Sequence, residues 1–168
     1  MATFRMPILG WATVPNASGD VFLESYDVKA TNDVWDALVV VFNDTATRIG
    51  LAGRFTVPKN FVGTAKIIVV WTTTATSGNV VWDFDYRAVG GDNSESLDQS
   101  GTQESVTVTD GAPGAAHRRM EASVSLTSSN LAVDDEVEFE LFRDGADAGD
   151  TMAAAALLFQ VLFEYADA

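Results

Sequence analysis

Strict alternation of apolar and polar side chains along one stretch is the feature that most constrains the fold of this chain. Between residues 80 and 88 the even positions are apolar or aromatic, and charged residues occupy most of the odd positions. A period of two places one set of side chains in a core and the other in water, which is typical of a strand in an antiparallel sheet. The even positions are Val80, Trp82, Phe84, Tyr86 and Ala88, and the charged odd positions are Asp83, Asp85 and Arg87.

Other segments of the chain repeat this pattern. Residues 120–126 and 136–143 alternate as cleanly, and turn-forming Gly, Pro, Asn and Asp residues separate the successive runs. No window has a helical period. We therefore predict an all-β domain, a two-sheet antiparallel sandwich of the jelly-roll type with about eight strands, and an immunoglobulin-like sandwich is the alternative. The other predicted strands cover residues 34–42, 50–57, 65–73, 103–109 and 157–165, with a weaker one near 20–24.

Length and composition predict one domain. A chain of 168 residues suffices for one core, so we expect a single β-sandwich domain over 1–168, with 1–15 as a candidate N-terminal arm. The chain has no cysteine, which excludes disulfides and thiolate chemistry. The first apolar patch is broken by Pro7 and Gly10, and no stretch approaches the ~20 apolar residues of a membrane span, so we expect a protein made without membrane insertion.

The net charge of −14 restricts the partners. So acidic a chain is repelled by the phosphates of nucleic acids and by anionic membranes, and we expect neither as a partner.

Three predicted strands are apolar on both faces, at residues 38–42, 67–71 and 157–163. A sandwich strand has only one face in the core, so the apolar residues of the outer face need a second cover. That cover is either a neighbouring subunit or loops of the same chain, and we predict a homo-oligomer. The residues expected at its interface are Val39, Val41, Ile68, Val70, Leu158 and Leu162.

The sequence holds little that could carry catalysis. His117 is the sole histidine, which excludes a two-histidine metal site within one chain, and no nucleophile elbow accompanies it. Asp83 and Asp85 share one face of a strand about 7 Å apart, so a glycosidase pair is conceivable, but no cleft is indicated. We predict a protein that is not an enzyme, with no catalytic residue.

Acidic turns are the only candidates for a metal. Asp144, Asp147 and Asp150 could wrap a calcium ion, and the cluster at 134–136 is also rich in oxygen ligands. Neither matches an EF-hand, so solvated turns are the preferred interpretation, as for the acidic loop 90–98. We predict no cofactor, with calcium in the turn 144–150 as the alternative.

Aromatic residues suggest a second kind of function. The aromatic row at positions 82–86 could stack on sugars, but it faces away from charged residues and is predicted to be core. Trp11, Trp35 and Trp71 remain as candidates for an exposed platform that binds carbohydrate.

Two segments carry a family resemblance. One is GRFTVPKNFVG at 53–63, and the other is EFELFRDGADAGDT at 138–151, followed by a last strand ending in Glu164-Tyr165. Together they resemble small jelly-roll proteins of tailed phages. The resemblance implies a non-enzymatic structural protein at the virion surface, made in the host cytoplasm, most simply a trimeric capsid decoration (cement) protein that contacts the major capsid protein. A tail-fibre or receptor-binding head domain, or a carbohydrate-binding module, is the alternative.

Overall fold

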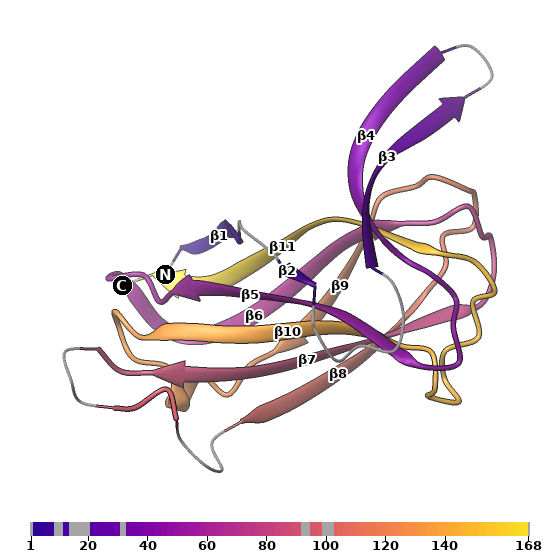
Figure 1. The fold of residues 1–168 in the computed structure, drawn as a ribbon. Coiled ribbons are helices and arrows are strands. Elements are labelled where there is room, and N and C mark those ends of the chain that lie inside the picture. The colour runs from indigo at the N-terminus through magenta and orange to yellow at the C-terminus, as the bar shows by residue number, and fades with distance from the viewer. Residues whose placement is uncertain are drawn as a thin grey trace.

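The computed structural model describes residues 2–8, 12–13, 21–30, 33–91, 95–98 and 103–167, and within residues 12–36 it describes only the backbone. Within these residues, eleven strands form two antiparallel sheets that pack face to face (Figure 1). The predicted all-β, two-sheet antiparallel sandwich is therefore confirmed. In the described part of the chain, no helix is long and apolar enough to cross a membrane.

The first sheet has six strands, in the order β3-β4-β11-β6-β9, and β1 also pairs with β11. Their bounds are β1 Thr3–Ile8, β3 Val21–Ala30, β4 Asp33–Phe42, β6 Phe61–Thr72, β9 Met120–Ser125 and β11 Ala156–Asp167. The candidate arm therefore contains a strand of the sandwich, whose last residue, Ile8, is 1% exposed.

The second sheet has five strands, in the order β2-β5-β10-β7-β8. Their bounds are β2 Ala12–Thr13, β5 Arg48–Thr56, β7 Asn79–Val89, β8 Glu104–Gly111 and β10 Glu136–Asp144. A short 3-10 helix, Ser128–Asn130, follows β9.

The hairpin of β3 and β4 extends beyond the sandwich (Figure 1). β4 pairs with β3 along its whole length, but it pairs with β11 only through Val40, Val41 and Phe42. Leu38, just past this contact, is 65% exposed. The sequence predicted a strand at 34–42, but no local pattern indicated that most of it leaves the body of the domain.

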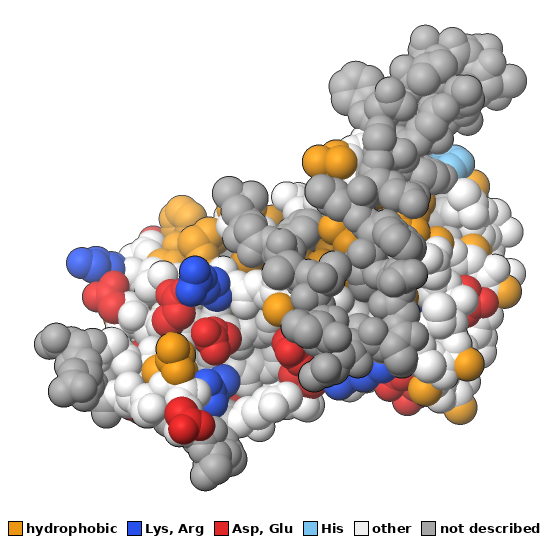
Figure 2. Space-filling model, in the orientation of Figure 1, with side chains coloured by type: hydrophobic (Ala, Val, Ile, Leu, Met, Phe, Trp, Pro, Cys, Tyr) orange, Lys and Arg blue, Asp and Glu red, His pale blue; other side chains and the backbone are white. Residues whose placement is uncertain are grey.

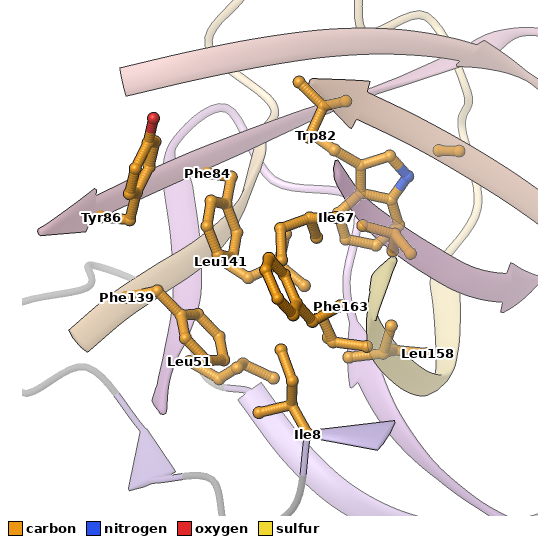
Figure 3. Close-up of a cluster of buried hydrophobic side chains, with 14 of the residues drawn as sticks. Ile8, Leu51, Ile67, Trp82, Phe84, Tyr86, Phe139, Leu141, Leu158 and Phe163 are labelled. Carbon is orange, nitrogen blue, oxygen red and sulfur yellow. The ribbon is translucent and has the colours of Figure 1, made fainter. Parts of the chain in front are cut away.

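The core lies between the sheets and is rich in aromatic rings (Figure 3). Phe84 stacks on Phe139 with ring centroids 4.9 Å apart, and Trp82 packs edge-on against Phe42 at 5.2 Å. Such pairs add to the free energy that area burial provides. The aromatic row at positions 82–86 is thus core, as predicted.

An irregularity in β11 alters the face on which one residue lies. The pairing of β11 with β6 shifts register between Leu158 and Gln160, where the neighbour of β11 on its other side changes from β4 to β1. An extra residue in a strand reverses the side-chain alternation beyond it. Leu158 therefore lies in the inter-sheet core with Val161 and is fully buried (Figure 3). The prediction that Leu158 shares the outer face with Leu162 is wrong for this reason.

Candidate functional site

The outer face of the five-stranded sheet carries rows of side chains set by the strand register. Glu140 on β10 lies between Ala52 on β5 and Asp85 on β7. In the next row, Glu138 lies between Arg54 and Arg87. A three-stranded part of this sheet, β5, β10 and β7, therefore presents one acidic row beside one of mixed charge.

A groove of about 620 Å³ crosses these two rows. Ala52 has only a methyl side chain and Gly53 has none, which leaves space between the longer charged side chains. Figure 2 shows this face, with Lys or Arg and Asp or Glu side chains interspersed over β5, β10 and β7. The lining comprises Ala52, Gly53, Arg54, Asp85, Tyr86, Arg87, Gln103, Glu138, Phe139 and Glu140.

The two carboxylates considered as a glycosidase pair are held in ion pairs. Arg48 donates from Nε to Asp83 Oδ2 at 3.0 Å and from Nη2 to Asp85 Oδ2 at 2.9 Å. Hydroxyls from β8 complete the network, with Ser105 donating to Asp85 at 2.6 Å and Thr107 to Asp83 at 2.7 Å. One guanidinium bridges both carboxylates, so these side chains link β5 to β7 across β10 and link β7 to β8.

Phe142 closes the outer face beside the groove. A Cβ at Gly50 would collide with its ring, so the glycine lets the ring lie across β5. The Cζ of Arg48 lies 3.9 Å from the centroid of the ring, within the range of a cation–π contact. Phe142 is only 6% exposed under this guanidinium. The groove therefore lies next to an aromatic ring that is capped.

The charged residues in the groove differ in whether they have partners. Arg87 lies 3.9 Å from Glu138 and also donates to the carbonyl of Leu97. Arg54 lies 3.8 Å from Glu136, just outside the groove. Glu140 is half-buried, and its carboxylate has no hydrogen-bond or ion-pair partner among the residues that the structure describes. It is the acceptor that a ligand could use at no cost to an existing contact.

A polar network lies at the end of the groove where β7 meets β8. The hydroxyl of Tyr86 donates to Glu104 at 2.7 Å and accepts a hydrogen bond from the backbone N–H of Thr127 at 2.9 Å. Burial, with the hydrogen bond to Glu104, raises the pKa of Tyr86. Burial alone would raise the pKa of Glu104, but hydrogen bonds from Thr127, Asn130 and Tyr86 outweigh it and lower that pKa. The network holds the tyrosine neutral and the glutamate charged beneath the groove.

The acidic turn 144–150, considered for calcium, is organised by an arginine. Arg143 is fully buried and binds both carboxylate oxygens of Asp150, at 3.0 and 2.7 Å. Asp150 also accepts from the backbone N–H of Val81 at 3.1 Å, and Asp147 accepts from Gly149. In the described parts of the chain, no group of three or more His, Asp or Glu side chains is arranged to hold a metal.

One of the three tryptophans predicted as an exposed platform, Trp71, lies in the core of the structure. Trp71 is fully buried and its Nε1 donates to Asp110 at 2.9 Å, so its prediction as an exposed platform is wrong. Trp11 and the side chain of Trp35 lie outside the described residues. His117 is in the loop between β8 and β9 with a positive φ of 64°.

The other residues predicted at an interface form two apolar clusters on the outer face of the six-stranded sheet. Val39 and Val41 pack with Leu157, while Ile68, Val70 and Leu162 form the second cluster, and Phe159 packs against both. Each of the predicted residues is at most 7% exposed within this single chain. An oligomer interface at these residues stays a prediction.

Comparison with known proteins identifies the fold and no closer kinship. No protein-family model and no curated protein matches the sequence. The resemblance to phage proteins is thus supported in its jelly-roll fold, and its virion assignment has no sequence match behind it.

Solved structures with a similar fold include carbohydrate-binding modules. The chain is similar to a family 35 carbohydrate-binding module from Clostridium thermocellum, with a TM-score of 0.55 and 13% identity over 99% of both chains. A CBM35 from Paenibacillus barcinonensis gives a TM-score of 0.52 at 12% identity, over 97% of this chain and 98% of that one. A CBM35 from Cellvibrio japonicus Abf62 gives 0.51 at 10% identity over 99% of both chains. At these identities the likeness is one of fold, a jelly-roll β-sandwich.

Proposed function

We propose that this protein is a non-catalytic carbohydrate-binding module that binds an oligosaccharide in the groove on the five-stranded sheet. The observation that carries the proposal is the groove itself, about 620 Å³ in volume and lined by the carboxylate of Glu140, which has no partner among the residues that the structure describes. Solved carbohydrate-binding modules that share the fold support this choice over other binding functions.

The chemistry of the lining suits a sugar. A carboxylate accepts two hydroxyl hydrogen bonds, and the guanidinium groups of Arg54 and Arg87 donate to ring and hydroxyl oxygens. These groups converge from three strands of one rigid sheet, so a ligand would meet them already in position. Phe142 is capped by Arg48, so we expect recognition by hydrogen bonds more than by ring stacking.

The same geometry favours binding without catalysis. A glycosidase needs a general acid and a second carboxylate flanking the scissile bond. Asp83 and Asp85 both pair with Arg48 and Glu138 lies 3.9 Å from Arg87, so Glu140 is the one groove carboxylate without an ion-pair partner among the described residues. We therefore retain the prediction that the protein is not an enzyme.

A glycan array followed by titration calorimetry on the best oligosaccharide tests this proposal. Loss of a hydrogen-bonded charged acceptor costs about 1.5–3 kcal/mol, so we expect Glu140→Ala to weaken binding by roughly ten- to hundredfold. Glu136→Ala, on the same strand and face but outside the groove, loses the long 3.8 Å contact with Arg54 and an exposed hydrogen bond from Thr56, and should bind within about threefold of the wild type. An array without any bound glycan, or equal affinity for wild type and Glu140→Ala, would refute the proposal.

A trimeric phage decoration protein at the virion surface is a second candidate, and one observation favours self-association. The β3–β4 hairpin leaves the sandwich, and Leu38 on it is 65% exposed. An isolated two-stranded hairpin is marginally stable in water, so a second copy or the capsid would be a suitable cover. Light scattering coupled to size exclusion measures the mass in solution: a trimer supports this candidate, and a monomer at high concentration counts against it.

A further inference from the structure

The charges in the groove are unevenly matched. Each guanidinium that lines it already has an acidic neighbour, Glu136 for Arg54 and Glu138 for Arg87. Asp85 is 5% exposed and is compensated by Arg48. Among the charged residues of the groove, Glu140 alone has no oppositely charged neighbour in the part of the chain that the structure describes. What this groove lacks is therefore a positive charge.

The position of Glu140 shows where in the groove a positive charge is missing. It lies at the centre of a row between Ala52, which offers no polar group, and Asp85, which shares the single positive charge of Arg48 with Asp83. A neutral hydroxyl can donate to this carboxylate, but an ammonium group adds the attraction of opposite charges to the hydrogen bond. The net charge of −14 acts in the same direction, because it attracts cationic ligands and repels uronic acids.

We propose that the groove prefers glycans that carry free amino groups, with an ammonium of the sugar bound by Glu140. This inference rests on the proposed carbohydrate-binding function and names its ligand class. The ligand is an oligomer of an unacetylated amino sugar. An N-acetyl group removes the positive charge and adds bulk, and a uronate places a like charge beside Glu140.

Calorimetry with three oligosaccharides of equal length tests the preference. The probes are oligomers of glucosamine, N-acetylglucosamine and glucose, each titrated at pH 6 into the full chain and into two variants, Glu140→Gln and Glu136→Gln. Both variants remove one negative charge from the same face of β10, but only Glu140 lines the groove.

For the wild type, we expect the glucosamine oligomer to bind at least about tenfold more tightly than the glucose oligomer, and this ratio should shrink as salt screens the charges. Glu140→Gln should abolish the ratio and still bind the glucose oligomer, because an amide keeps one acceptor for hydroxyls. Glu136→Gln should keep the ratio.

The remaining outcomes separate the two proposals. Equal affinity of the wild type for all three oligomers overturns the amine preference and leaves the carbohydrate-binding function intact. Equal loss of the ratio in Glu136→Gln and Glu140→Gln overturns the assignment to Glu140, since the overall negative field alone would then explain it. A failure to bind any oligosaccharide, on the array or in solution, overturns both proposals.

Discussion

The outer faces of the two sheets differ in composition and in exposure to water. On the six-stranded sheet the centre is apolar and closed, with Val70 only 1% exposed, and charged side chains lie toward β1 and β9. On the five-stranded sheet charged residues run across the centre, and a groove opens between them. One face thus adds apolar burial outside the main core, and the other keeps polar groups available to a ligand.

The difference has its origin in the strands. β4, β6 and β11 carry apolar residues on both faces, which gives the six-stranded sheet a second layer of apolar contacts. β7 and β10 alternate between apolar and charged residues, so their outer face carries charged side chains. The extra apolar burial therefore lies on the six-stranded sheet, and the proposed binding site lies on the five-stranded sheet. Substitutions on one face at a time test each of these roles.

A charge placed in the closed face should have the largest effect. Leu162 is 7% exposed in the cluster with Ile68 and Val70. Leu162→Asp buries a carboxylate without a partner and removes apolar contact, so we expect a loss of about 3 kcal/mol or more in the free energy of unfolding. Urea denaturation followed by circular dichroism measures this loss.

Ser123→Asp is the matched control for Leu162→Asp. Ser123 lies on the same outer face, on β9 opposite Ile68, but it is exposed. The same added charge should change the free energy of unfolding by less than about 0.5 kcal/mol. Similar losses in both variants would mean that charge repulsion, and not burial, governs this face.

A substitution on the open face should have an intermediate effect. Arg48→Met removes the cation–π contact with Phe142 and leaves Asp85, 5% exposed, without its counter-ion. We expect a loss of about 1–2 kcal/mol, because the penalty for the uncompensated carboxylate is reduced by hydrogen bonds from Ser105. Thermal unfolding by calorimetry measures it.

Arg54→Met provides the control for Arg48→Met on the same strand and face. The side chain of Arg54 is 73% exposed and its ion pair with Glu136 is long, so the change in stability should be near zero. Equal effects of the two substitutions would show that the interactions of Arg48 contribute no more to stability than those of a solvated arginine.

Much of this fold was predictable, because alternation reports burial directly. The charged outer face at 83, 85 and 87 and the strands that are apolar on both faces were both evident from the spacing of apolar residues and from composition. The groove was not, since it depends on which strands are neighbours: Ala52, Glu140 and Asp85 come from three distant segments that only the register brings together. The one available signal was the run of alternate glutamates at 136, 138 and 140, which the sequence alone placed on a solvated face.

The error at Leu158 has a different origin. An alternating pattern assumes an unbroken strand, and a register shift at the point where β11 changes neighbours violates that assumption. Such irregularities are set by tertiary pairing, so residues 157–163 could be read as apolar but not assigned correctly to faces. The same limit applies to the hairpin at 21–42, whose local sequence does not encode that most of it leaves the sandwich.

The smallest expected effect concerns the charged rim of the closed face, and it depends on pH. Burial alone would raise the pKa of Glu121, but hydrogen bonds from Arg119 and Arg5 outweigh it and hold the pKa below the ordinary 4.5. A carboxyl whose pKa is lower in the folded state stabilises the fold above the ordinary value, and this contribution is lost as pH falls through the folded one. Glu121→Gln should therefore cost about 0.5 kcal/mol at pH 7, and its stability should converge with that of the wild type as the pH falls below 4.5 and through the lowered pKa of Glu121. Denaturation across pH 3–8 measures the difference.

Glu138→Gln, on the open face and 3.9 Å from Arg87, should cost less at neutral pH. A larger loss for Glu138→Gln would reverse the contrast between the faces, because it would assign the structural ion pairs to the side that we propose binds the ligand.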